Sequence, residues 1–192
     1  MKKQIIQREN NNIEIDIEEK YKDKIDKIMD ISEELIHEGI YRKIWPKNKT
    51  NEDNELYNIC TNKLVNVVPK KIGINEKYIN EYIWQNIIYL INTKYDFNNY
   101  KTPMKKIKCF ENIYNIIDKS INVITNKKSQ YSVDDIFPIF VYLLIQTKPE
   151  NLVTNLNFIK LLINKKNLIK SSGFALTQLE MAVQYLQNIE IS

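Results

Sequence analysis

Residues that interrupt a helix are rare in this sequence, and their rarity constrains the fold more than any other feature. The 192 residues include only three glycines and five prolines. A β-sandwich of this length needs a turn signal about every 8–12 residues, and the sequence does not supply them. Between the breakers, apolar residues recur at helical spacing. The sequence therefore predicts an all-α fold, with one layered helical domain of about seven helices.

Breakers and capping residues divide the chain into segments. Residues 1–14 are predicted to be a flexible leader, so that the helical domain covers 15–192. Thr102 and Pro103 indicate a helix start, because Thr is a good N-cap and Pro fits the first helical position. Ser132, followed three residues later by Asp135, resembles a capping box. The expected helices cover residues 15–45 (with a break near Gly39 left open), 52–67, 76–94, 102–124, 132–146, 150–163 and 176–189, and residues 164–175 are expected to form a loop.

Composition argues against several classes of function. The 28 basic and 24 acidic residues give a net charge of only +4, with the signs interspersed, whereas nucleic-acid binding favours a dense basic patch. One histidine and the separated Cys60 and Cys109 do not make a zinc site, so we expect buried thiols, no metal and no cofactor. The longest apolar runs, 136–145 and 82–91, are far shorter than the roughly 20 residues of a membrane span. With no signal peptide visible, we expect a cytoplasmic monomer.

Two acids and a proline near the start of the helix at 132–146 form the most informative local pattern. Asp134 and Asp135 have a purely structural explanation, because acids in a first turn complement the helix dipole by about 0.3–1 kcal/mol each. Pro138 is harder to explain, since it lacks an N–H and crowds the carbonyl of Asp134. The run that follows is apolar on all sides, which is typical of a central helix. The pattern predicts a kinked core helix with two carboxylates at its N-terminal end.

The stretch Ser132-Val-Asp-Asp-Ile-Phe-Pro resembles the signature of the vacuolar-protein-sorting-nine family, in which two acids and two apolar residues precede a proline and an apolar helix. Pro149-Glu-Asn-Leu resembles a helix start of the same family, and Gly173-Phe-Ala-Leu-Thr resembles the beginning of its Gly-Tyr-x-x-Thr block. The resemblance is strongest over 132–183. Looser similarities at 41–46, 69–74 and 102–103 extend it over about residues 20–192.

This resemblance implies a guanine nucleotide exchange factor for a small GTPase of the Rab-five class, acting in endosomal or vesicle trafficking. The GTPase switch regions would dock in a groove between the helix that opens at Asp134 and the helix that opens near Thr177. Asp134 would be the catalytic acid, inserted into the nucleotide and magnesium site. Thr177 would bond the GTPase backbone or cap the last helix, and Asp135 would also pair with the cap residue Ser132. The residues implied to bind the GTPase are Pro138, Phe174, Thr177, Asp135 and Gly173.

Two other interpretations stay open. Phe174 stands where the family usually has Tyr, and a lost hydrogen bond costs about 0.5–1.5 kcal/mol. The domain is therefore either an active exchange factor or an exchange-inactive scaffold that binds a GTPase. The third interpretation is a helical adaptor whose partner surface lies elsewhere, which would be favoured if Asp134 and Thr177 were far apart or buried. Any membrane association is expected to be peripheral, on endosomal membranes and through a partner.

Overall fold

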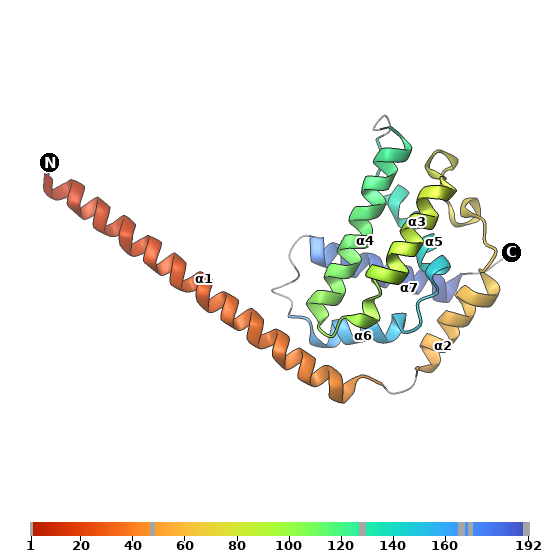
Figure 1. Ribbon diagram of the computed structural model, residues 1–192, viewed down its shortest axis with the longest axis horizontal. Helices are drawn as coiled ribbons and strands as arrows, with labels where there is room; N and C mark the ends of the chain where they lie inside the picture. The colour runs from red at the N-terminus through yellow and green to blue at the C-terminus, as the bar shows by residue number, and fades with distance from the viewer. Residues whose placement is uncertain (1, 47–48, 127–129, 165–167, 169–170, 190–192) are drawn as a thin grey trace. The chain divides into compact units, whose positions relative to one another are not determined.

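A computed structural model describes residues 2–46, 49–126, 130–164, 168 and 171–189, with side chains in the first helix described from Glu19 onward. Within these ranges the chain forms seven α-helices and no strand, so the predicted all-α class is confirmed (Figure 1). The helices are α1 (Lys2–Ile44), α2 (Asn51–Asn58), α3 (Glu81–Lys94), α4 (Pro103–Ile124), α5 (Val133–Thr147), α6 (Leu152–Leu162) and α7 (Ser171–Asn188). A π-helical segment, Ile59–Lys63, follows α2, and short 3-10 turns cover Pro69–Ile72, Glu76–Tyr78 and Phe97–Asn99.

The chain divides into two compact units, residues 1–45 and residues 46–192. The first unit is formed by α1, which begins at Lys2 and therefore includes the residues predicted to be a leader. The helix also continues through Gly39, since a single glycine costs a helix only about 1 kcal/mol and the segment contains no proline. The division between a leader and a domain at residue 14 stays a prediction.

Local capping signals correctly located two helix starts. The Thr102 hydroxyl oxygen accepts the backbone N–H of Lys105 at 3.3 Å, and Pro103 is the first residue of α4. The capping box at the start of α5 is also present: the Asp135 carboxylate accepts the Ser132 N–H at 2.8 Å and the Ser132 hydroxyl at 3.1 Å. Both signals depend only on residues within one turn, so the sequence alone is enough to identify them.

Two other predicted starts were wrong. The segment predicted as a helix from residue 76 begins with a 3-10 turn, and α3 starts only at Glu81, because the Asn80 side chain caps the Ile83 N–H at 3.0 Å. The last helix starts at Ser171, earlier than the predicted Leu176, so Gly173 lies inside α7 and not in a loop. The remainder of the predicted loop falls partly outside the described residues.

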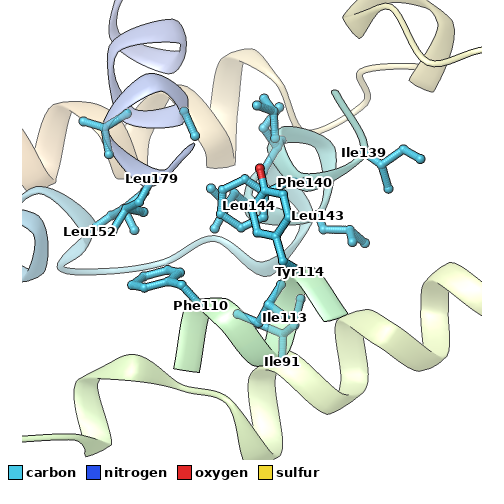
Figure 2. Packing of buried hydrophobic residues seen from close by; sticks show 14 of the residues in the cluster. Ile91, Phe110, Ile113, Tyr114, Ile139, Phe140, Leu143, Leu144, Leu152 and Leu179 are labelled. Carbon is cyan, nitrogen blue, oxygen red and sulfur yellow. The ribbon is translucent and has the colours of Figure 1, made fainter. Parts of the chain in front are cut away.

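The second unit is built around α4, which contacts α3, α5, α6 and α7 (Figure 1). The apolar run of α5 is buried as predicted, and Figure 2 shows Phe140 and Leu144 of that run packed near Tyr114 of α4. Full burial of a side chain of this size contributes about 1.5–3 kcal/mol. The thiols of Cys60 and Cys109 are free and buried, which confirms the prediction. None of the described helices is long and apolar enough to cross a membrane.

A buried acid joins α2 to the start of α6. Asp53 of α2 is 1% exposed, and one carboxylate oxygen accepts the backbone N–H groups of Val153 at 2.9 Å and Thr154 at 3.2 Å. The other oxygen accepts the Thr154 hydroxyl and, at 2.8 Å, the Thr50 hydroxyl. Asp53 thus caps the start of α6 from a position 100 residues earlier in the chain. This contact fixes the helix that leads from α5 to α7.

Candidate functional site

A groove runs along the second unit where α4 faces the first turns of α5 and α7. It encloses about 240 Å³, with apolar surface from both α5 and α7. The resemblance implied a groove between these two helices, and the structure adds α4 as its third wall. The residues that line it are Lys108, Glu111, Tyr114, Asn115, Asp118, Val133, Ile136, Ser171, Phe174 and Ala175.

The predicted acids lie at the α5 end of this groove. Asp134 and Asp135 stand between two lining residues, Val133 and Ile136, in the first turn of the helix. The Asp134 side chain is exposed, and among the described residues it makes no hydrogen bond or ion pair. Asp135 is half-buried and closes the cap with Ser132, as the sequence predicted. Of the two acids, only Asp134 therefore has a carboxylate that makes no hydrogen bond or ion pair with a described residue.

Pro138 lies one turn further along α5, and the helix continues through it to Thr147. Because proline has no N–H, the carbonyl of Asp134 lacks its usual intrahelical donor. The ring is only partly buried. Its neighbour Phe137 packs edge-on against Tyr185 of α7, with ring centroids 6.4 Å apart. This contact ties the first half of α5 to α7 close to the predicted site.

The three predicted residues of α7 lie in its first two turns. Phe174 is 39% exposed and lines the groove, and its ring meets Tyr114 of α4 edge-on at 5.5 Å. Thr177 is exposed, and its hydroxyl donates to the Gly173 carbonyl at 3.0 Å. The alternative that Thr177 caps the last helix is therefore wrong, because the helix begins two turns earlier. Gly173 itself has no unusual φ, and a Cβ there would make only ordinary contacts with Leu168.

The α4 wall was missed at the sequence level. Lys108, Glu111, Tyr114 and Asp118 follow one another at spacings of three and four, so they share one face of the helix. Such a mixed polar stripe is also what a solvated helix face looks like, so the pattern carried no clear signal. In the structure Glu111 is 6% exposed and Tyr114 is buried. This face of α4 thus forms a wall of the groove, with Glu111 and Tyr114 buried and Lys108 exposed.

Glu111 of this face forms an ion pair with Lys108. Its carboxylate lies 2.6 Å from the ammonium of Lys108, and it lines the groove together with Ser171 of α7. Burial by itself raises the pKa of Glu111, but the interactions with Lys108 and with the hydroxyls of Ser171 and Ser172 outweigh it, so the pKa is lowered. The group is therefore an ionised acid at neutral pH, at the α4 wall of the groove.

The predicted residues thus gather around one groove, although they do not all line it. Phe174 lines it directly, while Asp134 and Asp135 flank it at α5 and Gly173 precedes Phe174 at α7. Pro138 and Thr177 each lie two residues, about half a helical turn, beyond the nearest lining residue, Ile136 or Ala175. Neither Asp134 nor Thr177 is buried under another described element, so the burial that would favour the adaptor interpretation is not observed. Among the described residues, no group of three His, Cys, Asp or Glu is arranged to hold a metal ion.

The chain is similar to several curated proteins over most of its length. It is 23% identical over 175 residues to the "Rab5 GDP/GTP exchange factor" of Mus musculus, covering 88% of this chain and 34% of that protein. It is 22% identical over 170 residues to the "Receptor-mediated endocytosis protein 6" of Caenorhabditis briggsae, covering 86% of this chain and 15% of that protein. It is 29% identical over 96 residues to "Protein MUK1" of Saccharomyces cerevisiae, covering 50% and 14%. The chain thus spans about a third or less of each of these relatives.

A family model described as "Vacuolar sorting protein 9 (VPS9) domain" matches residues 90–191. The match begins within α3 and includes every wall of the groove, so it covers the part of the chain that carries the strongest motifs. Because it extends over more than half of the chain, the protein belongs to the VPS9 domain family.

Proposed function

We propose that this protein is a guanine nucleotide exchange factor that promotes GDP release from a small GTPase of the Rab5 class. Membership of the VPS9 family supports the proposal, as do relatives that carry the name Rab5 GDP/GTP exchange factor. The observation that carries it is the exposed Asp134 carboxylate at the edge of a groove between α5 and α7. This carboxylate makes no hydrogen bond or ion pair with a described residue. The switch regions of the GTPase would bind this groove.

The proposed mechanism requires no covalent chemistry from the protein. A small GTPase holds its nucleotide through a P-loop lysine, backbone amides and a magnesium ion. The Asp134 carboxylate would enter that site, pair with the lysine, displace the metal and repel the phosphates. Two unit charges about 4 Å apart interact by roughly 4 kcal/mol at an effective dielectric near 20. Since each 1.4 kcal/mol or so changes a rate tenfold, one well-placed acid is enough to speed release by orders of magnitude.

The other predicted residues would bind the GTPase without taking part in release. Phe174 offers an exposed ring edge at the groove, and Pro138 and Thr177 extend the contact surface along α5 and α7. Gly173 allows close approach at the first turn of α7. Asp135 contributes by holding the first turn of α5 through its bonds to Ser132, which keeps Asp134 in place.

The test is the release of fluorescent GDP from a panel of Rab5-class GTPases, with the wild type and with Asp134→Asn. The substitution keeps the shape of the side chain and removes its charge, so we expect the maximal release rate to fall about 100-fold or more. Glu55→Gln, at an exposed acid of α2, serves as the charge-matched control and should act like the wild type. Equal release rates with Asp134→Asn and with the wild type would rule out the proposed role of the acid.

A second candidate function is a scaffold that binds the GTPase without accelerating exchange. Phe174 favours it, because the exposed ring has no hydroxyl to offer to a switch region. In that case the protein should retain the nucleotide-free GTPase in a pulldown and yet leave GDP release at its intrinsic rate. Phe174→Tyr should then raise the release rate if the hydroxyl is the missing element, and a variant as inactive as the wild type would place the defect elsewhere.

We further propose that the protein acts on the cytoplasmic side of endosomal membranes and reaches them through its partner. The relatives named for endocytosis and vacuolar sorting support this location. Co-fractionation with endosomal membranes that is lost on removal of the GTPase would agree with it. Binding to protein-free vesicles would contradict recruitment through a partner.

A further inference from the structure

We propose that the protein has a second binding site, a pocket between α3 and α5 that takes the arginine side chain of a partner protein. The pocket encloses about 210 Å³ and shares no lining residue with the groove described above. The inference goes beyond the proposed function and does not depend on it, since it holds equally for an exchange factor and for a scaffold.

The pocket and the groove lie on different sides of α5. Tyr142 lines the pocket, and Val133 lines the groove. These two residues are nine positions apart, which is about two and a half helical turns, so their side chains point to opposite sides of the helix. A partner at the pocket would therefore not compete directly for the groove. The other lining residues belong to α3 or to the segment before it: Pro69, Ile79, Glu81, Trp84, Gln85 and Ile88.

The floor of the pocket is aromatic, and its rim carries an acid. Trp84 is buried and Tyr142 is half-buried, with ring centroids 5.1 Å apart, so the two rings form the floor. Glu81 and Gln85 are exposed and lie about one turn apart on α3, so they form the rim. The Glu81 carboxylate makes no hydrogen bond or ion pair with a described residue, and none of the described lining residues is basic. An apolar floor beside an unpaired negative charge complements an organic cation.

Size and geometry select one arginine side chain as the occupant. Pockets that hold drug-sized ligands enclose about 300–1,000 Å³, so a volume of about 210 Å³ suits a single side chain better. A cation placed over the face of tryptophan or tyrosine is attracted by the ring. The planar guanidinium of arginine stacks on such rings while its N–H groups bind a carboxylate, so it matches the floor and the rim together. The compact, strongly hydrated ammonium of lysine matches only the rim.

Exposed tyrosines beside the pocket indicate that the arginine belongs to a protein. Tyr82 is 80% exposed and Tyr89 is 68% exposed. Together with Gln85 of the rim they follow one another at spacings of three and four, so they share one face of α3. Tyrosine and arginine are both enriched in protein interfaces, where an anchor side chain fills a pocket surrounded by other contacts. The face of α3 beside the pocket can supply those surrounding contacts.

The experiment titrates the protein with N-acetylarginine amide as the probe and follows the indole N–H of Trp84 by nuclear magnetic resonance. A Trp45→Phe variant assigns the signal, because Trp45 is the only other tryptophan in the sequence. We expect a saturable shift with a Kd in the millimolar range. N-acetylcitrulline amide, which has the same length and a planar but neutral end, should bind about tenfold more weakly.

Substitutions at three acids locate the probe. Glu81→Gln should weaken arginine binding about tenfold, since the lost hydrogen bonds involve a charged acceptor. Glu52→Gln, at an exposed acid in the first turn of α2, is the matched control and should bind like the wild type. Asp134→Asn should also bind like the wild type, and a loss of binding in that variant would place the arginine at the groove and overturn the site. Equal binding by the wild type and Glu81→Gln would overturn it too.

Two further probes test the nature of the occupant. Equal binding of the arginine and citrulline probes, or tighter binding of the neutral aromatic p-cresol, would overturn the cationic occupant. A pentapeptide with leucine on both sides of arginine should bind the wild type about tenfold more tightly than the single amino acid does, because its leucines bury apolar surface. The double substitution Tyr82→Ser and Tyr89→Ser should remove this gain. A peptide that gains nothing in the wild type would overturn the role of α3 in binding a protein.

Discussion

Lys106 offers a sharp test of the packing around α4, because it is a lysine with no exposed surface. Its ammonium donates to the Phe97 carbonyl at 2.8 Å and to the Asn155 side-chain oxygen at 2.5 Å. Asn155 in turn donates to the Asn98 side-chain oxygen at 2.8 Å. Burial lowers the pKa of Lys106 to about 7, although the nearby Asp96 carboxylate acts in the opposite direction. The folded protein therefore loses this proton far more readily than the unfolded chain does.

The sign and size of the effect follow from linkage. An unfolded lysine has a pKa of about 10.4, so between about pH 7 and pH 10 the unfolded state binds more protons than the folded state. Stability then rises with pH, by up to about 1.4 kcal/mol per pH unit. At the lower end of this range, folded Lys106 is only half deprotonated. From about pH 7 to about pH 9 its contribution to the free energy of unfolding should increase by about 2 kcal/mol.

The assay is urea unfolding of the wild type and of Lys106→Met at about pH 7, 8 and 9. We expect the difference in unfolding free energy between them to shift by about 2 kcal/mol in favour of the wild type over that range. Taking the difference removes the titration of other groups. The control is Lys101→Met, which replaces an exposed lysine just before α4. This variant should keep the pH dependence of the wild type. A difference that stays constant within about 0.5 kcal/mol would refute the lowered pKa.

Three further predictions follow from buried or helical positions. Gly173→Ala should raise the free energy of unfolding by about 0.5–1 kcal/mol in urea titrations, because Gly173 lies inside α7 with room for a Cβ; a loss of stability would mean that the helix does not extend there. Asp53→Ala should lower the free energy of unfolding by about 2–4 kcal/mol, since two backbone N–H groups and the Thr154 hydroxyl lose their acceptor. A change below about 1 kcal/mol would contradict the capping role of Asp53. Burial raises the pKa of the Cys60 and Cys109 thiols to about 11 and about 12, so a thiol reagent at neutral pH should modify them only after unfolding; rapid modification of the native protein would refute their burial.

The functional proposal could be reached largely from the sequence, because its elements are local. The Asp134–Pro138 pattern, the Gly173–Thr177 block and the capping residues each lie within about two helical turns. The free Asp134 and the bonded Asp135 were also distinguishable, since the spacing from Ser132 selects Asp135 as the cap partner. These motifs did not reveal the α4 wall of the groove, which lies between α5 and α7 in the fold.

The sequence by itself determined the helical class, the helix starts at Thr102 and Ser132, and the membership that the family match bears out. Capping and hydrophobic periodicity act over a few residues, so they can be identified without the fold. Only the tertiary structure decided where α7 begins and which acids are buried. The partners of Asp53 lie 100 residues away in the chain, so no local pattern contains them, although a hydrogen bond to a charged acceptor is about twice as strong as one between neutral groups.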